Sequence, residues 1–201
     1  MIKYLNALLK ILKNYKLYLF PILIMELIFF MKYNSKFNKF KNLNSNQSSD
    51  PIPCSFYVLR KIERFIIKNN IKTICDLGSG YGKIIYFFGF IKKFQIDGVE
   101  LDNEIYKDTL FLKDTNINIF NENILNFKLE NKKYDLLIIN DPLKRIQDFD
   151  NLIKKIKTIN YKVFIVMINI SLDKIKIAND NLEIINNKFF SKNRNVLFFK
   201  K

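Results

Sequence analysis

Residues Asp76 to Gly82 read Asp-Leu-Gly-Ser-Gly-Tyr-Gly and are the part of the sequence that most clearly indicates the fold. It follows a short segment at residues 73–75 that has the composition of a buried strand, and it precedes a helical pattern over residues 82–93. Ligands bind at such strand-to-helix turns in open α/β sheets. Because glycine lets the backbone turn tightly and approach a ligand closely, we expect a binding loop here.

The spacing of the glycines separates this loop from two phosphate-binding loops. The dinucleotide pattern G-x-G-x-x-G would need a glycine where the chain has Lys83, and the G-K-[ST] ending of a P-loop is absent. Asp76, which we expect at the mouth of the loop, would repel a phosphate but suits a cationic ammonium or sulfonium group. The loop therefore disfavours phosphate as its ligand.

A second acidic position follows the next predicted strand, in Val99-Glu100-Leu101-Asp102. A carboxylate at this strand end can accept hydrogen bonds from both ribose hydroxyls of an adenosine-type ligand. Asp76, the glycine loop and Glu100 together therefore predict such a ligand. The alternative interpretation is a glycine-rich turn beside a surface glutamate.

Strand and helix patterns alternate through the rest of the chain. We expect strands at residues 73–75, 95–100, 116–120, 134–140, 161–169, 182–185 and 195–199. We expect helices at residues 54–69, 82–93, 103–113, 145–158 and 171–179, the third with Ile105, Leu110 and Phe111 facing inward. This order predicts an α/β fold with a doubly wound, Rossmann-like, seven-stranded sheet, and the last two strands predict an antiparallel C-terminal pair.

The composition supports one globular domain and excludes several chemistries. The 201-residue chain is 49% hydrophobic and 15% aromatic, which is ample for a core. It has no histidine, which excludes Ser-His-Asp and Cys-His catalysis and nearly every zinc site, so we expect no metal. Its two cysteines, Cys54 and Cys75, cannot form a disulfide framework.

The net charge of +15 is weak evidence for a nucleic-acid partner. Only four of the 34 basic residues are arginine, and the lysines are spread along the chain rather than gathered in one patch. Asn and Ile are abundant as well, which indicates a compositional bias rather than a basic binding face.

An apolar run at residues 17–31, interrupted by Pro21 and Glu26, follows a basic amphipathic pattern near the N-terminus. It is shorter than the ~20 residues of a full membrane span. We expect residues 1–33 to form a hydrophobic helical anchor, with membrane association through residues 2–31 either by spanning or by lying on the surface. A signal peptide and a helical arm that packs on the domain or a partner are the alternatives.

A polar segment rich in Asn and Ser, residues 34–50, follows this run and ends before Pro51. We interpret it as a linker, because such a composition does not pack into a core. The globular domain is then predicted to comprise residues 51–201.

This domain resembles the class I S-adenosylmethionine-dependent methyltransferases. Asp76–Gly82 matches the first motif of that family, and Glu100 matches its ribose-binding acid. The resemblance implies S-adenosyl-L-methionine as the cofactor and a methyl acceptor as the substrate. It implies that the cofactor is held by Asp76, Gly78, Ser79, Gly80, Glu100, Leu101 and, at the adenine, Asn123, and that the acceptor is contacted by Asn140 and Asp141.

The chain is similar in particular to small bacterial methyltransferases and to membrane-associated protein-lysine methyltransferases related to the enzyme of the mitochondrial ATP synthase c-subunit. Pro51-Ile52-Pro53 and the apolar run at residues 17–31 have counterparts there. This resemblance implies a protein lysine as the acceptor. It also implies a membrane-associated protein whose catalytic domain faces the cytoplasm, where the cofactor is made.

The segment Asn140-Asp141-Pro142-Leu143 leaves other functions open. Methyltransferases that act on nucleobases carry N/D-P-P-aromatic here, and the aromatic stacks on the flipped base. Leu143 cannot stack, so nucleic-acid N-methylation is the less favoured alternative. Asp141 could instead cap the helix at residues 145–158. A non-catalytic protein that uses the same fold to bind a nucleoside or a partner is the remaining hypothesis.

Overall fold

A seven-stranded sheet runs through the part of the chain that the computed structural model describes, which comprises residues 24, 26–28, 48–50, 54–191 and 194–201. The strand order is β3-β2-β1-β4-β5-β7-β6. The strands are β1 (Thr73–Leu77), β2 (Gln95–Glu100), β3 (Ile117–Asn121), β4 (Leu136–Ile139), β5 (Phe164–Ile168), β6 (Glu183–Ser191) and β7 (Arg194–Lys200). Strands β1 to β5 pair in parallel, and β7 runs antiparallel to both β5 and β6. The predicted doubly wound sheet and its antiparallel C-terminal pair are therefore confirmed.

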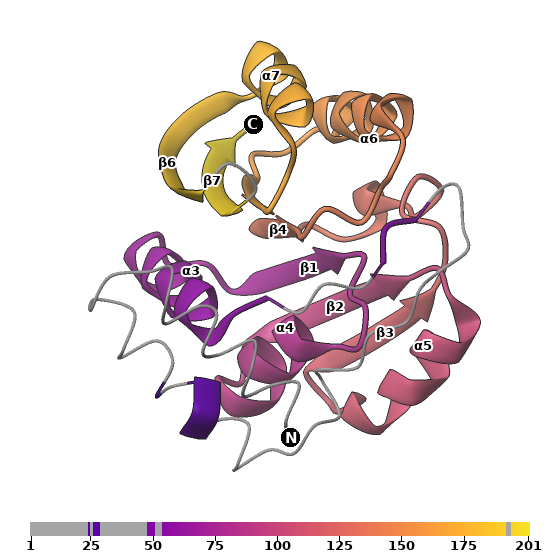
Figure 1. Cartoon of the computed structure of the whole chain (residues 1–201). Helices are drawn as coiled ribbons and strands as arrows, with labels where there is room; N and C mark the ends of the chain where they lie inside the picture. The colour runs from indigo at the N-terminus through magenta and orange to yellow at the C-terminus, as the bar shows by residue number, and fades with distance from the viewer. Residues whose placement is uncertain (1–23, 25, 29–47, 51–53, 192–193) are drawn as a thin grey trace.

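Helices cover both faces of this sheet (Figure 1). The helices are α3 (Phe56–Lys68), α4 (Lys83–Ile85), the π-helix η3 (Tyr86–Ile91), α5 (Asn103–Thr109), the 3-10 helices η4 (Leu110–Leu112) and η5 (Leu129–Asn131), α6 (Ile146–Thr158) and α7 (Leu172–Asn181). Helices α3, α4 and α5 lie on one face, whereas α6 and α7 lie on the other.

Two hydrophobic cores result, one on each face, and β4 contributes to both. Leu136 and Ile138 pack into the core with α3 and α4, whereas Leu137 and Ile139 pack into the core with α6 and α7. All four side chains are fully buried, because successive residues of a strand point to opposite faces and both faces are covered. This explains why the segment is almost wholly apolar.

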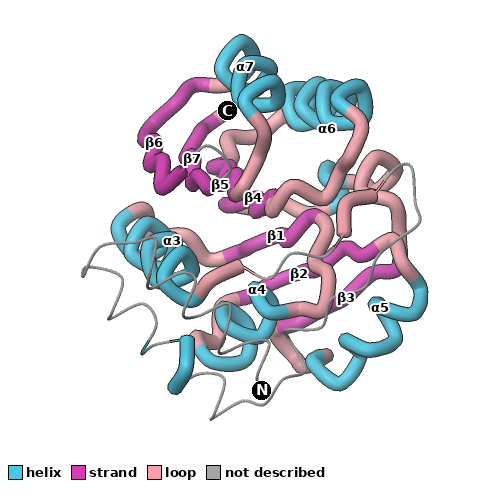
Figure 2. Tube along the Cα trace, in the orientation of Figure 1, coloured by secondary structure: helices cyan, strands magenta, loops and turns pink. Residues whose placement is uncertain are grey.

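Strand β1 is longer than the sequence predicts. It continues through Asp76 to Leu77, and Asp76 pairs in register with Gly98 of β2 and Ile138 of β4. The acidic residue therefore lies inside the sheet rather than after it. The loops that follow β1 and β2 meet at the carboxyl edge of the sheet (Figure 2).

Two predicted helices are shorter and less regular than expected. The helix expected at residues 82–93 is a three-residue α-helix continued by a π-helix. The helix expected at residues 103–113 changes to a 3-10 turn after Thr109. Ile105, which lies before this turn, is buried as predicted. Leu110 and Phe111 are exposed, contrary to the prediction, because the tighter 3-10 turn rotates their side chains away from the core.

Most of the predicted N-terminal anchor, residues 1–33, lies outside the described residues. Within the described residues, no helix is long and apolar enough to cross a membrane. Glu26 is described, and it contacts the domain: its carboxylate lies 3.3 Å from Lys83 Nζ and accepts a hydrogen bond from the backbone N–H of Phe56. This carboxylate therefore accepts from one of the first N–H groups of α3, which have no carbonyl partner within the helix itself.

Candidate functional site

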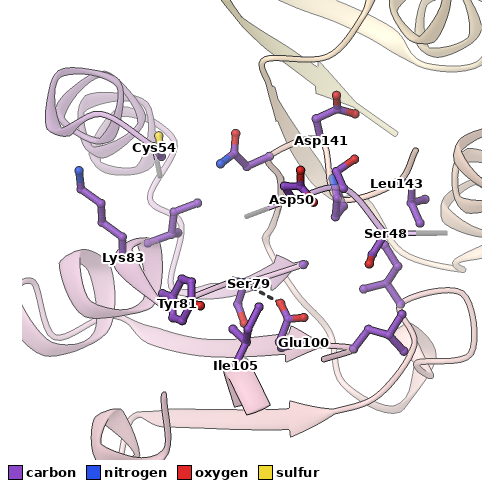
Figure 3. A pocket seen from close by; sticks show the side chains of 18 of the residues that line it. Ser48, Asp50, Cys54, Ser79, Tyr81, Lys83, Glu100, Ile105, Asp141 and Leu143 are labelled. Atoms are coloured by element: carbon purple, nitrogen blue, oxygen red, sulfur yellow. Dashed lines mark hydrogen bonds between the residues drawn. The ribbon is translucent and has the colours of Figure 1, made fainter. Parts of the chain in front are cut away.

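A pocket opens at the carboxyl edge of the sheet, where the loops after β1, β2, β3 and β4 converge. In Figure 3, Glu100 lies on its lower side and Asp141 on its upper side. The residues lining it include Gly78, Ser79, Gly80, Glu100, Leu101, Asn123, Asn140 and Asp141. The structure thus brings all the predicted site residues except Asp76 to the wall of one pocket.

The glycine loop after β1 needs glycine for its conformation and for its packing. Gly78, Gly80 and Gly82 all have positive φ angles, of 84°, 52° and 79°. A Cβ atom on Gly78 would lie 2.2 Å from Pro142 Cβ, so the loop after β4 packs directly against this position. The N–H groups of Gly78 and Ser79 both donate to the carbonyl of Val99, at 2.9 Å, which ties the loop to β2.

Glu100 ends β2 and is held in place by two backbone donors. Its Oε2 accepts from Gly80 N–H and its Oε1 accepts from Asp102 N–H, both at 2.8 Å. Burial raises the pKa of Glu100 above its ordinary value, and these two hydrogen bonds oppose that shift. Asp102 in turn caps α5 by accepting from the N–H groups of Glu104 and Ile105. Glu100 is therefore a fixed acceptor on the pocket wall.

Asp76 differs from its predicted position at the mouth of the loop. It is fully buried behind the loop, and neither of its carboxyl oxygens has a hydrogen-bond partner within the described residues. Burial, with the negative charge of Glu100, raises the pKa of Asp76 to about 8. The buried hydroxyl of Ser79 likewise lacks a partner in the described part of the chain. Such orphaned polar atoms are costly unless a ligand or ordered water satisfies them, so they fit a polar ligand at this loop.

Asn123 starts the turn that follows β3. Its Oδ1 accepts from Leu125 N–H at 2.9 Å, and its carbonyl accepts from the N–H groups of Asn126 and Phe127. The amide NH₂ of Asn123 is the part of the side chain that can donate to a ligand. Because the residue also lines the pocket, its predicted place beside the glycine loop and Glu100 agrees with the geometry.

Asn140 and Asp141 follow β4, and each is held by a residue that the sequence did not single out. Asn169, which directly follows β5, donates from Nδ2 to Asn140 Oδ1 at 3.1 Å. Lys174 of α7 is buried and donates to Asp141 Oδ1 and to the carbonyl of Leu143. Burial raises the pKa of Asp141, and the ammonium of Lys174 opposes this shift. No local sequence pattern marks Asn169 or Lys174, because both contacts span about thirty residues.

The hypothesis that Asp141 caps the following helix is wrong. Helix α6 begins at Ile146 with Arg145 in the cap position, and that cap makes no side-chain hydrogen bond to the helix. Arg145 pairs instead with Asp148 of the first turn, at 2.7 Å. Asp141 adopts a left-handed φ of 44° and bonds to α7, so its carboxylate fixes the turn after β4 rather than α6.

Residues 48–50, which belong to the predicted linker, also line the pocket. Ser49 N–H donates to the carbonyl of Pro142 at 2.9 Å, and Ser48 forms an antiparallel bridge with Leu143. Cys54 also lines the pocket, and burial raises the pKa of its thiol. Among the described residues, no cluster of His, Cys, Asp or Glu could hold a metal ion.

Comparison with known proteins identifies the architecture. No protein-family model matches the sequence, and no curated protein sequence matches it. The structure matches the methyltransferase domain of bacterial CtHen1-CN with a TM-score of 0.59 at 12% identity, over 72% of this chain and 97% of that one. It matches the putative methyltransferase yhhF from Escherichia coli with a TM-score of 0.58 at 11% identity, over 81% and 98%. The chain has the Rossmann-like methyltransferase fold.

A third match has its cofactor present. Magnesium protoporphyrin IX methyltransferase from Synechocystis PCC 6803, with bound SAM, gives a TM-score of 0.55 at 12% identity, over 72% of this chain and 77% of that one. Other matches are larger proteins: the chain spans 53% of the StiE O-MT chain. Because the matched proteins share little sequence with this chain, the comparisons establish the fold, and the activity has to be argued from the site.

Proposed function

We propose that this protein is an S-adenosylmethionine-dependent methyltransferase. The observation that carries the proposal is the position of Glu100: a buried carboxylate at the end of β2, oriented by Gly80 and Asp102, on the wall of a pocket that the glycine loop also lines. A carboxylate at this place in a doubly wound sheet suits a ribose diol. The unsatisfied polar atoms of Asp76 and Ser79 also fit a polar ligand against the loop.

In this proposal, different residues of the pocket contact different parts of the cofactor. When bound, S-adenosylmethionine supplies a methyl group on a sulfonium, which is already a good electrophile. Glu100 would accept hydrogen bonds from the ribose, Asn123 would donate to the adenine, and the glycine loop would face the amino-acid portion. Asn140 would orient the methyl acceptor. The reaction requires little acid–base catalysis from the protein, because its main requirement is that the acceptor, the methyl group and the sulfur are held in line.

The direct test is transfer of labelled methyl groups. The full-length protein is incubated with methyl-tritiated S-adenosylmethionine and cell fractions, in parallel with Glu100→Gln and with Glu104→Gln as a matched control on the exposed start of α5. We expect incorporation with the wild type and the control but not with Glu100→Gln. Equal incorporation by the wild type and Glu100→Gln would contradict the proposed site.

We propose further that the acceptor is an amine, such as a lysine side chain of a protein. Asn140, Asp141 and Asp50 place amide and carboxylate oxygens along the acceptor side of the pocket, and such groups suit an amine or ammonium. Leu143, which replaces the base-stacking aromatic, is itself buried in the core beside α6, which disfavours a flipped base. Protease-sensitive label in the transfer experiment would support an amine on a protein, whereas nuclease-sensitive label would favour nucleic acid.

Association with a membrane surface is proposed for the N-terminal segment. Ile24, Leu27 and Ile28 are exposed, while Glu26 between them contacts the domain. Exposed apolar side chains on a segment that is rich in lysine suit an anionic bilayer surface. Flotation of the full-length protein with phosphatidylserine vesicles tests this, and we expect Leu27→Glu/Ile28→Glu to reduce it. The proposal places the catalytic domain on the cytoplasmic side.

A further inference from the structure

The connection between β3 and β4, residues 122–135, must hold Asn123 at the pocket although it contains little regular structure. Its only described helical element is the short 3-10 turn η5. Backbone carbonyls outside a helix or sheet need other donors when they are removed from water. Ile124 and Phe127 of this connection are buried in the core beneath α6, so their backbone lies close to that helix.

Lys155 of α6 supplies the missing donor. Its Nζ lies 2.7 Å from the carbonyl oxygen of Leu125, 2.5 Å from that of Phe127 and 3.5 Å from that of Ile124. An ammonium has three N–H donors, so one side chain can serve this whole group of carbonyls. The lysine is partly buried among them, and burial lowers its pKa, whereas the charges of Glu122 and Glu130 oppose that shift.

The carbonyl groups that accept hydrogen bonds from Lys155 belong to the turn that begins at Asn123. Asn123 closes the turn from its other side, through Oδ1 to Leu125 N–H and through its carbonyl to the N–H groups of Asn126 and Phe127. The turn therefore has its N–H groups bound by Asn123 and its carbonyls bound by Lys155. Asn123 is therefore part of a turn that hydrogen bonds hold on both sides, and this turn fixes the position of its side-chain NH₂ group.

We propose that Lys155 is a positioning residue of the cofactor site: its ammonium closes the turn at residues 123–127 and thereby fixes Asn123 at the adenine end of the pocket. The inference rests on the proposed function. The neighbouring Lys154 provides a matched control, because it is exposed and pairs with Asp150 at 2.7 Å instead of contacting the turn. Lys154→Met and Lys155→Met remove the same charge one residue apart.

The test compares two ligands on the full-length protein by calorimetry: S-adenosylhomocysteine and S-inosylhomocysteine. Inosine presents a carbonyl and an N–H where adenine presents an amine and an acceptor nitrogen, so a site that donates to adenine rejects it. We expect Lys155→Met to weaken S-adenosylhomocysteine binding about tenfold and to weaken S-inosylhomocysteine binding much less. The ratio of the two affinities, which measures the preference for adenine, should therefore fall. Lys154→Met should change neither. Equal weakening of both ligands, or wild-type affinity for both, would overturn the proposal.

Amide hydrogen exchange gives a readout that needs no ligand. Lys155→Met should speed exchange at Leu125, Asn126 and Phe127, and Lys154→Met should not; unchanged exchange would overturn the inference. If Lys155→Met does not fold, two milder variants replace it. Lys155→Arg retains the charge and should lose only part of the preference for adenine. Lys155→Gln removes the charge, and a preference for adenine equal to that of the wild type in this variant would count against the proposal. Failure of the wild type to bind S-adenosylhomocysteine would contradict the proposed function, whereas the exchange result would still decide the role of Lys155.

Discussion

Replacement of Gly78 by alanine should separate the two loops that form the pocket. Gly78 has a φ of 84°, and an added Cβ would meet Pro142 Cβ at 2.2 Å and Pro142 Cγ at 3.0 Å. The left-handed conformation costs a non-glycine residue about 1–2 kcal/mol. Forcing the overlap apart in a packed region costs about 1–3 kcal/mol more. We therefore expect Gly78→Ala to lower the free energy of unfolding by about 2–5 kcal/mol, the sum of these two ranges.

The conformational and steric parts of this loss of stability can be measured separately. In Pro142→Gly the two closest atoms are removed, and the next, Pro142 Cα, lies 3.6 Å from the added Cβ, which is an ordinary contact. In that background Gly78→Ala should retain only the conformational cost of about 1–2 kcal/mol. The assay is urea unfolding followed by far-ultraviolet circular dichroism, since the chain has no tryptophan. An identical loss in both backgrounds would refute the close approach of the two loops.

Three other substitutions test the turn after β4, the buried carboxyl of Asp76 and the start of α3. Lys174→Met leaves the partly buried Asp141 carboxylate without its ammonium, so the free energy of unfolding should fall by about 1.5–3 kcal/mol, and adding Asp141→Asn should recover part of that loss in the same urea assay. Asp76 has an ordinary pKa of 3.8 and a pKa of about 8 in the fold, so the folded state binds the extra proton and the ligand-free protein should lose stability as the pH rises from about 4 through 8. Asp76→Asn should flatten that pH dependence, and an unchanged slope would count against the burial of this carboxyl. Glu26→Gln weakens the hydrogen bond to the first N–H of α3 and removes the ion pair with Lys83, so it should lower the free energy of unfolding by about 1 kcal/mol, and in a Lys83→Met background the loss should shrink.

The sequence predicts the sheet well because its evidence is local. The glycine spacing after Asp76 and the apolar run at β4 depend on residues close together in the chain, and each has one simple structural explanation. The order of strands and helices then leaves few topologies, because parallel strands need crossover connections. The observed sheet agrees with the predicted one, including the antiparallel β7.

The errors and omissions have a different physical origin. The α-helical periodicity predicts Leu110 and Phe111 in the interior, but the chain tightens to a 3-10 turn there and rotates them outward. Lys155, Lys174 and Asn169 hold the loops through contacts that span about thirty residues, and a lysine or asparagine in such a role has the same local pattern as one in solvent. Only the packing of α6, α7 and β5 against the pocket loops reveals them.

Calorimetric binding of S-adenosylhomocysteine to the full-length protein, with Glu100→Gln and Glu104→Gln beside it, tests most directly whether this pocket is a cofactor site. Glu100 is the acceptor that two backbone N–H groups fix on the pocket wall, whereas Glu104 lies exposed on α5. Saturable binding by the wild type and Glu104→Gln, weakened about tenfold or more in Glu100→Gln, is the predicted result, because a hydrogen bond to a charged group is lost. A folded wild-type protein that does not bind, or a Glu100→Gln variant that binds as tightly as the wild type, would contradict the assignment.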